Sequence, residues 1–208
     1  MRIILTRHGQ TDWNLEERLQ GQKDIPLNCH GQLQAKFLAD CLKDSRITKA
    51  FSSSLARAQE TTEILLGNRA IRLELVPALQ EISHGDWEGC LETEICQRNP
   101  HQFHLWKTHP LACHKPNGET LHQLHSRAIP AWQSLMHYCA GACHENILVV
   151  THKFTIQVIL CHVCGLDIKH FWDFPQGNCA INIIDYHDGK PQLRTTNLNA
   201  WESGLVGI

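Results

Sequence analysis

Short apolar runs that open into polar residues recur along the chain and predict the strands of an α/β sheet. Residues 3–5 lead into residues 6–9, and residues 147–150 lead into Thr151 and His152. Continuous apolar runs of this length, each followed by polar residues, are typical of buried parallel strands. Because open α/β sheets bind ligands at the carboxyl ends of their strands, the polar residues at these two ends are candidates for a functional site.

The remaining strands follow from shorter patterns. A second strand is predicted over residues 48–52, and the alternation of apolar and polar side chains over residues 71–75 predicts a third. Residues 179–186 and 192–197 are expected to close the sheet as two strands around a turn at the Asp-Gly pair 188–189.

Helical periodicity occupies the segments between the strands. The apolar positions with this spacing in the first helix are Leu33, Phe37, Leu38, Cys41 and Leu42. Further helices are predicted over residues 55–66, 119–138 and 154–164, and Pro130 is expected to kink or divide the second of these. The alternation of strands and helices predicts one α/β domain over residues 1–208, with three α/β/α layers, a largely parallel central sheet and helices on both faces.

Residues 85–118 break this rhythm. They are rich in Trp, His and Pro and are too long for a simple connection. We expect short helices here that cover a site, which would make this insertion the segment that selects the substrate.

Composition narrows the classes of function. The 208 residues carry a formal net charge of −2 with acidic and basic residues interspersed, which gives no electrostatic reason to expect nucleic acid or an anionic membrane as a partner. No stretch approaches the roughly 20 apolar residues of a membrane span, and the first apolar run is too short for a signal sequence, so a cytoplasmic protein is expected. The ten cysteines are expected to be mostly reduced, buried thiols.

Basic and imidazole side chains gather at the predicted strand ends. His8 and His152 follow two separate strands, and Arg7 and Arg57 lie at or just after strand ends. A planar guanidinium binds two phosphate oxygens at once and stabilises the charge of a phosphoryl group during transfer. A single histidine or arginine at such a position is more often structural, so the prediction of a phosphomonoester site depends on the convergence of all four.

His8 and Glu81 are the candidates for the chemistry itself. A neutral imidazole nitrogen can attack phosphorus and form a phosphohistidine that water hydrolyses in a second step. A partly buried carboxylic acid can protonate the departing alkoxide and then act as a base toward that water. Glu81 lies just beyond the third predicted strand and is placed to do this. Because side chains fill every role, neither a cofactor nor a metal ion is expected.

Two groups of potential metal ligands are set aside. The first consists of His101, His104, His109 and His114, which no carboxylate accompanies at a recognisable interval. The second, Cys161 and Cys164, lies in an apolar helical stretch without a second cysteine pair, where core packing is the better interpretation.

Colinear blocks over most of the chain resemble the histidine phosphatase superfamily, which includes the cofactor-dependent phosphoglycerate mutases. The blocks are Leu5-Thr6-Arg7-His8-Gly9-Gln10-Thr11 with Trp13-Asn14, residues 18–27 with Gly31 and Gln34-Ala35, and residues 52–58, 81–89 and 150–152. The resemblance implies a phosphoglycerate mutase-like fold.

The resemblance also implies roles, with His8 as the nucleophile and Glu81 as the proton donor. Lys153 departs from the pattern, because many members have Gly after the second histidine. Lys153 could attract a carboxylate of the substrate, but a lysine at the start of a helix more often points to water, so it is not counted among the site residues. The residues placed around the phosphoryl group are Arg7, Asn14, Gln20, Gly21, Arg57 and His152.

Within the superfamily the chain resembles the phosphatase branch, and in particular metal-independent phosphoserine phosphatases. The blocks that carry this likeness are residues 84–87, 103–106, 117–121 and 165–172. O-Phospho-L-serine is therefore the expected substrate. By the resemblance His84 contacts its carboxylate or amino group, while the alternative is a loop histidine packed under Trp87.

Other activities stay open at this point. An α-ribazole phosphatase, a sugar-phosphate or broad-specificity phosphatase and a phosphoglycerate mutase share the mechanism, and a non-catalytic phospholigand-binding protein is a further alternative. The expected partner is a small phosphorylated metabolite, and the resemblance makes a homodimer plausible. Residues 197–208 would select small substrates if this tail folded over the mouth of the pocket, although a mobile terminus is commoner.

Overall fold

Six strands form one sheet in the part of the chain that the computed structural model describes, residues 1–140 and 145–203. Four neighbouring strands of the sheet are parallel to one another. The last two strands of the chain are added at one edge by antiparallel pairing. The predicted, largely parallel sheet is therefore confirmed. In spatial order the strands are β3 (Leu73–Leu75), β2 (Ile47–Ser52), β4 (Asn146–Thr151), β1 (Arg2–Arg7), β5 (Ile181–His187) and β6 (Lys190–Leu198).

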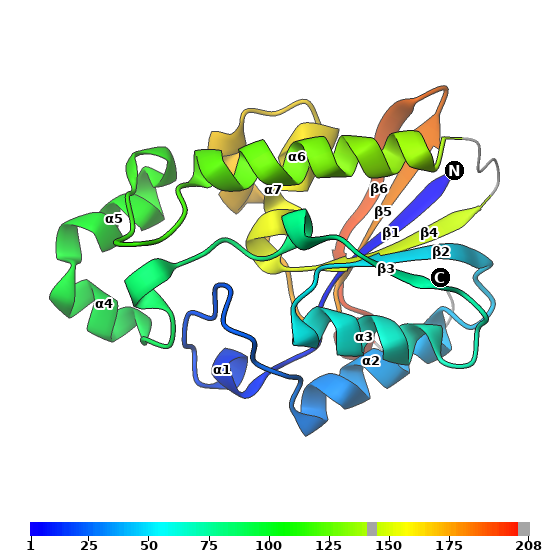
Figure 1. Cartoon of the computed structure of the whole chain (residues 1–208), viewed down its shortest axis with the longest axis horizontal. Helices are drawn as coiled ribbons and strands as arrows, with labels where there is room; N and C mark the ends of the chain where they lie inside the picture. Colours follow the sequence, from blue (N-terminus) through cyan, green and yellow to red (C-terminus); the bar gives the residue numbers. More distant parts are fainter. Residues whose placement is uncertain (141–144, 204–208) are drawn as a thin grey trace.

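Helices cover both faces of the sheet (Figure 1). On one face lie α2 (Cys29–Cys41) and α3 (Ala56–Leu66), and on the other lie α6 (Leu121–Tyr138) and α7 (Lys153–Val163). This is the predicted three-layer arrangement. The shorter elements are α1 (Asp12–Leu15), α4 (Glu92–Arg98), α5 (Pro100–Thr108), α8 (Ala200–Ser203) and 3₁₀ turns at Pro77–Leu79, Gly85–Trp87, Pro110–Ala112 and Ile168–Asp173.

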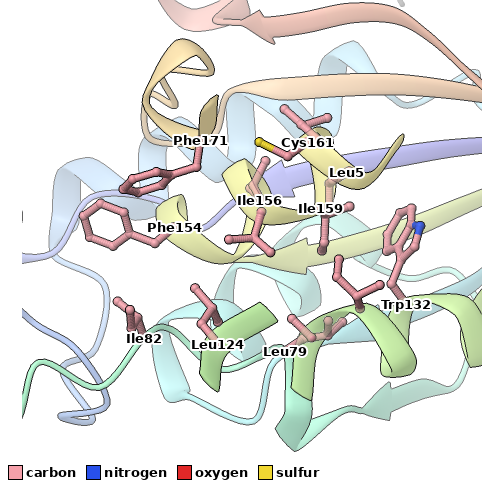
Figure 2. Packing of buried hydrophobic residues seen from close by; sticks show 14 of the residues in the cluster. Leu5, Leu79, Ile82, Leu124, Trp132, Phe154, Ile156, Ile159, Cys161 and Phe171 are labelled. Carbon is pink, nitrogen blue, oxygen red and sulfur yellow. The ribbon is translucent and has the colours of Figure 1, made fainter. Parts of the chain in front are cut away.

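An apolar cluster fixes the α6 and α7 layer to the sheet. Figure 2 shows Leu124 and Trp132 of α6 and Ile156 and Ile159 of α7 around Leu5 of β1. All five side chains are 0% exposed. Burial contributes roughly 1.5–3 kcal/mol for a side chain of this size. The cluster therefore holds the start of α7, which follows directly on β4, in a fixed place.

The C-terminal hairpin forms as predicted. Asp188 and Gly189 join β5 to β6 with positive φ angles of 50° and 74°. Two successive residues with left-handed backbone make a turn whose twist matches that of the strands, and an Asp-Gly pair favours it.

The prediction that Pro130 kinks or divides its helix is wrong as to division, because α6 continues through the proline. The helix runs over 18 residues from Leu121 to Tyr138 with Pro130 inside it. Pro130 is exposed, whereas its neighbours Ile129 and Trp132 are buried. The proline removes one main-chain hydrogen bond, and the packing of α6 on the sheet offsets that loss.

The insertion at residues 85–118 folds into short helices, as predicted. Figure 1 shows α4 and α5 beyond the end of the sheet toward which the parallel strands run. Trp106 of α5 is 1% exposed and packs its ring against Phe154 at the start of α7, with a centroid separation of 5.2 Å. The insertion is thereby anchored beside the carboxyl ends of the strands.

Cysteine burial follows the prediction in part. Burial raises the pKa of Cys161 and Cys179 to about 12, which keeps these thiols protonated and unreactive. Cys164, in contrast, ends α7 and is exposed, so the prediction of core packing holds for Cys161 only. Among the described residues, none of the helices combines the length and the apolar character that a membrane span requires.

Leu33 does not belong to the buried face of α2, contrary to the prediction. Its side chain is 51% exposed, whereas Leu38 in the same helix is 1% exposed. The buried face instead includes Gln34, whose side-chain oxygen accepts a hydrogen bond from the main-chain N–H of Gln10 at 3.0 Å. The predicted positions Leu38, Cys41 and Leu42 are buried, so apolar spacing and a polar contact with the loop after β1 together set which face of the helix is buried.

This difference gives a matched test within one helix. Leu38→Ala is expected to lower the free energy of unfolding by roughly 2–5 kcal/mol, because it leaves a cavity in the core. Leu33→Ala should change it by less than about 0.5 kcal/mol, because the side chain is already in water. Urea denaturation of both variants measures the difference, and equal losses would contradict the packing described for α2.

Candidate functional site

The pairing of β1 with β4 brings the two strand-end histidines together. The register places Arg7 beside Thr151, and the main-chain N–H of His8 donates to the carbonyl oxygen of Thr151 at 3.0 Å. The rings of His8 and His152 consequently lie with their centroids 5.2 Å apart. The convergence expected from the two strand ends is therefore present.

His8 is held as a neutral imidazole. Its Nδ1 lies 2.7 Å from the carbonyl oxygen of Gly9, and since a carbonyl only accepts, Nδ1 carries the proton. Its Nε2 then has a lone pair, to which Nε of Arg57 donates at 3.3 Å. Burial, together with the guanidinium groups of Arg57 and Arg7, holds the pKa of His8 well below its usual value. The nitrogen with the lone pair is thus the one that faces the guanidinium group of Arg57.

Arg57 is buried and Arg7 is half-buried, and neither cation forms an ion pair with a carboxylate of the described residues. Arg57 donates to the carbonyl oxygens of Gly21 and Lys23, each at 2.8 Å, and Arg7 donates to that of Gln176 at 2.8 Å. Nε of Arg7 is a buried atom with no hydrogen-bond partner among the described residues. Burial lowers the pKa of both guanidinium groups to about 10. They remain charged at neutral pH, and together they form a site for an anion.

Gly21 shapes the loop that holds Arg57. Its φ of +53° is left-handed, and a Cβ at this position would collide with the carboxylate of Glu88. Oε1 of Glu88 accepts hydrogen bonds from the main-chain N–H groups of Gln22 and His84, each at 3.0 Å. One carboxylate therefore ties the loop around Arg57 to the loop that follows β3.

Glu81 is fixed by main-chain donors at the edge of the same site. Its Oε1 accepts from the N–H of Ile82 at 2.9 Å, and its Oε2 accepts from the N–H of Phe154, in the first turn of α7, at 3.2 Å. The side chain is 6% exposed. The carboxyl group is therefore held in one orientation from two sides.

Arg127 and Glu119 position the main chain of Glu81. Arg127 donates to the carbonyl oxygen of Glu81 at 2.8 Å and forms an ion pair with Glu119 at 2.7 Å. Glu119 also accepts from the main-chain N–H of Ser83 at 2.8 Å. The sequence did not identify this pair, because neither residue is next to the site along the chain, and only the docking of α6 brings them there.

His8, Arg7, Arg57 and Glu81 line a cavity of about 330 Å³. The cavity lies at the carboxyl ends of the parallel strands, as expected for an α/β sheet. The predicted site residues that line it are Arg7, His8, Asn14, Gln20, Gly21, Arg57, Glu81 and His84.

His152 is the predicted site residue that does not line this cavity. Its side chain is 0% exposed and lies behind His8, with Nε2 2.7 Å from Oγ of Ser53. Burial and the charge of Arg57 hold the pKa of His152 well below its usual value. Its contact with the cavity is therefore through His8.

His84 lies in the cavity wall and also belongs to an aromatic cluster. Its ring is 1% exposed and meets the rings of Trp106 and Phe154 edge-on, at centroid distances of 5.8 and 5.5 Å. The expected alternative, packing under Trp87, is thus not the observed contact. Burial, with the charges of Lys115 and Lys153, holds the pKa of His84 well below its usual value. Its buried Nδ1 has no hydrogen-bond partner within residues 1–140 and 145–203.

Several residues of the cavity wall were missed in the sequence. Glu92 and Lys107 come from the insertion, which the sequence placed near the site without naming residues. Lys153 was expected to point to water, yet it lines the cavity. The further residues of the wall are Trp13, Glu17, Arg18, Leu19, Phe154 and Trp172.

Two further expectations concern metal ligands and the C-terminal tail. The described residues contain no group of three or more His, Cys, Asp or Glu side chains arranged to hold a metal ion. In the tail, Trp201 of α8 packs edge-on against Phe37 of α2, and it is not among the residues that line the cavity. Residues 204–208 lie outside the described part of the chain.

The buried neutral histidines predict how stability depends on pH. His8, His84 and His152 have lowered pKa values in the folded state, so below about pH 6.5 the unfolded chain binds protons that the folded chain does not. The free energy of unfolding should therefore fall as the pH falls, by up to about 1.4 kcal/mol per pH unit for each histidine. Urea denaturation between pH 6.5 and 5 measures the slope.

The control for this prediction is the variant His8→Asn, which lacks one of the three imidazoles. Its slope should be smaller than that of the original chain by up to about 1.4 kcal/mol per pH unit. A free energy of unfolding that stays constant over this range would contradict the neutral, buried state of these rings.

Comparison with known proteins places this geometry in a family. The family model of the histidine phosphatase superfamily (branch 1) matches residues 3–199. The chain is 30% identical over 95% of its length to the "Probable 2-carboxy-D-arabinitol-1-phosphatase" of Arabidopsis thaliana, but spans only 41% of that protein. It is 26% identical over 95% of its length to phosphoserine phosphatase 1 of Hydrogenobacter thermophilus, of which it spans 92%.

A solved structure agrees with these relatives. The α-ribazole phosphatase from Shigella flexneri superimposes on the chain with a TM-score of 0.89 and 26% sequence identity, covering 100% of this chain and 99% of its own. The three names give three different substrates, so the likeness identifies the reaction class and leaves the substrate open. The chain belongs to the histidine phosphatase superfamily and is a phosphatase with a phosphoglycerate mutase-like fold.

Proposed function

We propose that this chain hydrolyses a small phosphomonoester metabolite through a phosphohistidine on His8. One observation carries the proposal: the buried guanidinium group of Arg57 and the half-buried one of Arg7, neither with a carboxylate partner among the described residues, lie in the same cavity as a neutral imidazole whose Nε2 has a lone pair. A phosphomonoester dianion would neutralise both cations and would bring its phosphorus next to the nucleophilic nitrogen.

In the first step, Nε2 of His8 forms a bond to phosphorus while the bond from phosphorus to the ester oxygen breaks. Arg7 and Arg57 would bind the non-bridging oxygens, with Asn14, Gln20 and Gly21 on the cavity wall around them. Positioned positive charge of this kind is the main source of catalysis in phosphoryl transfer. His152 would act from behind, by holding the position of His8.

Glu81 supplies the proton that the departing alkoxide needs. The two main-chain bonds to its carboxyl group keep it facing the cavity edge, so that it is placed to donate a proton there. In the second step the resulting carboxylate takes a proton from water, which attacks phosphorus and releases phosphate and free His8. Each role belongs to a side chain, so no metal ion takes part in the proposed mechanism.

O-Phospho-L-serine is the substrate that we propose. The cavity of about 330 Å³ is at the small end of the range for metabolite sites, roughly 300–1,000 Å³. One of the relatives over the whole chain is a phosphoserine phosphatase. The buried His84, whose Nδ1 has no partner, lies in the wall where the serine part of the substrate would sit, and residues 85–118 contribute Glu92 and Lys107 there.

The activity test is a hydrolysis screen at pH 7 with a chelator present. The panel consists of O-phospho-L-serine, α-ribazole phosphate, sugar phosphates, 3-phosphoglycerate and p-nitrophenyl phosphate. We expect phosphate release to persist in the chelator and to be fastest for O-phospho-L-serine. His8→Ala should lower kcat by at least about 10³-fold, whereas the exposed control His122→Ala should leave it unchanged.

Glu81→Gln gives a second readout of the same mechanism. It should lower kcat by roughly 10²–10⁴-fold for an alkyl phosphate, because the alkoxide then leaves without a proton. The loss should be much smaller for p-nitrophenyl phosphate, whose leaving group needs no proton. Undiminished turnover by His8→Ala, or activity that chelator abolishes and magnesium restores, would contradict the proposal.

A further inference from the structure

Lys153 lies in the cavity wall, and its positive charge has no role in the proposed binding of the phosphoryl group by Arg7 and Arg57. Its ammonium group forms no ion pair with a carboxylate among the described residues. The two other basic side chains of the wall outside the phosphoryl site are already neutralised: Lys107 pairs with Glu92 at 2.6 Å, and Arg18 pairs with Glu16 at 2.5 Å. Lys153 therefore differs from both.

The surroundings of Lys153 place its charge toward the part of the cavity beside the phosphoryl site. It directly follows His152, and its ammonium lies 5.3 Å from the ring centroid of Phe154 and 5.8 Å from that of Trp172. Both aromatic residues line the cavity. A cation held against aromatic rings loses part of its hydration, and burial and the nearby charge of Arg7 accordingly lower the pKa of Lys153.

The charge balance of the cavity indicates what Lys153 binds. A phosphomonoester carries about two negative charges near neutral pH, which Arg7 and Arg57 balance. Of the carboxyl groups near Lys153, Glu92 already pairs with Lys107, and Glu81 is the proton donor of the proposed mechanism. A third cation in the wall, partly withdrawn from water, is therefore costly unless the ligand brings a second anionic group. In a small metabolite that group is most simply a carboxylate.

We propose that Lys153 binds the carboxylate of the substrate and that the chain selects phosphate monoesters of small hydroxy or amino acids. This inference rests on the proposed function, because it assumes that phosphate occupies the site of Arg7 and Arg57. The aromatic wall of Phe154 and Trp172 orients the ammonium and limits the length of the substrate. Lys153 is in this account a specificity residue and takes no part in the transfer of the phosphoryl group.

The test compares substrates that differ only in the carboxylate. The matched pairs are O-phospho-L-serine with O-phosphoethanolamine, and 3-phospho-D-glycerate with glycerol 3-phosphate. For each pair the ratio of kcat/KM values, carboxylate over no carboxylate, is measured in the original chain and in Lys153→Met. The ratio should fall roughly 30-fold or more in Lys153→Met, as for the loss of one partner of a desolvated charge pair.

Two further variants separate charge from structure. Lys153→Arg keeps the charge and should retain most of the ratio. Lys169→Met removes the charge of an exposed lysine that does not line the cavity, and it should leave the ratio unchanged. A ratio that Lys153→Met leaves within twofold of the original overturns the inference, whether both substrates lose activity equally or neither does. An equal loss of kcat/KM for both substrates of a pair would indicate that Lys153 acts on the phosphoryl group or on Glu81.

Measuring the binding of substrates to the inactive variant His8→Ala makes the test independent of turnover. Calorimetry should give tighter binding of O-phospho-L-serine than of O-phosphoethanolamine, with the preference lost in the double variant that also carries Lys153→Met. If the preference is present but the original chain hydrolyses no phosphomonoester, the proposed function fails and the carboxylate site stands. If His8→Ala binds both ligands equally, the carboxylate site is overturned whatever the activity.

Discussion

Two guanidinium groups withdrawn from water, neither in an ion pair with a carboxylate of the described residues, are the constraint on which the rest of the site depends. Arg57 is 0% exposed, and carbonyl oxygens and the His8 ring take up its hydrogen bonds. Burial, together with this positive charge, holds the pKa values of His8 and His152 well below the usual value, and the charge leaves the cavity in need of an anion. It also requires that the loop around Gly21 point its carbonyl groups inward, which the left-handed backbone at Gly21 permits.

The core of the protein and its chemistry are coupled through α7. This helix is packed on β1 and α6 by an apolar cluster, and its first turn supplies the N–H group that fixes Glu81. The same turn carries Lys153 into the cavity wall. On the opposite side, the ion pair of Arg127 with Glu119 holds the main chain of Glu81. A loss of packing under α7 would therefore disturb the proton donor and the wall of the cavity together.

The features that the sequence predicts well are those that local pattern determines. A buried strand followed by polar residues is a property of adjacent positions, and so the placement of His8 at the end of β1 was predictable. Leu33, Arg127 and Lys153 behave differently, because their surroundings come from residues distant in the chain. Gln34 takes the buried face of α2 through a bond to another loop, and spacing alone cannot anticipate such a partner. The substrate is hard to predict for the same reason, since the wall of the cavity is assembled from separate loops and helices.

The most direct test of the account is the chemical identity of the phosphorylated residue. Glu81→Gln slows the release of phosphate from the proposed intermediate, so a rapid quench of this variant with ³²P-labelled O-phospho-L-serine or p-nitrophenyl phosphate should trap labelled protein. Alkali preserves phosphohistidine and destroys acyl phosphates, and mass spectrometry of the digest locates the label. The account predicts alkali-stable phosphate on His8, up to one per chain. Turnover without label on His8, or label on a different residue, would contradict it.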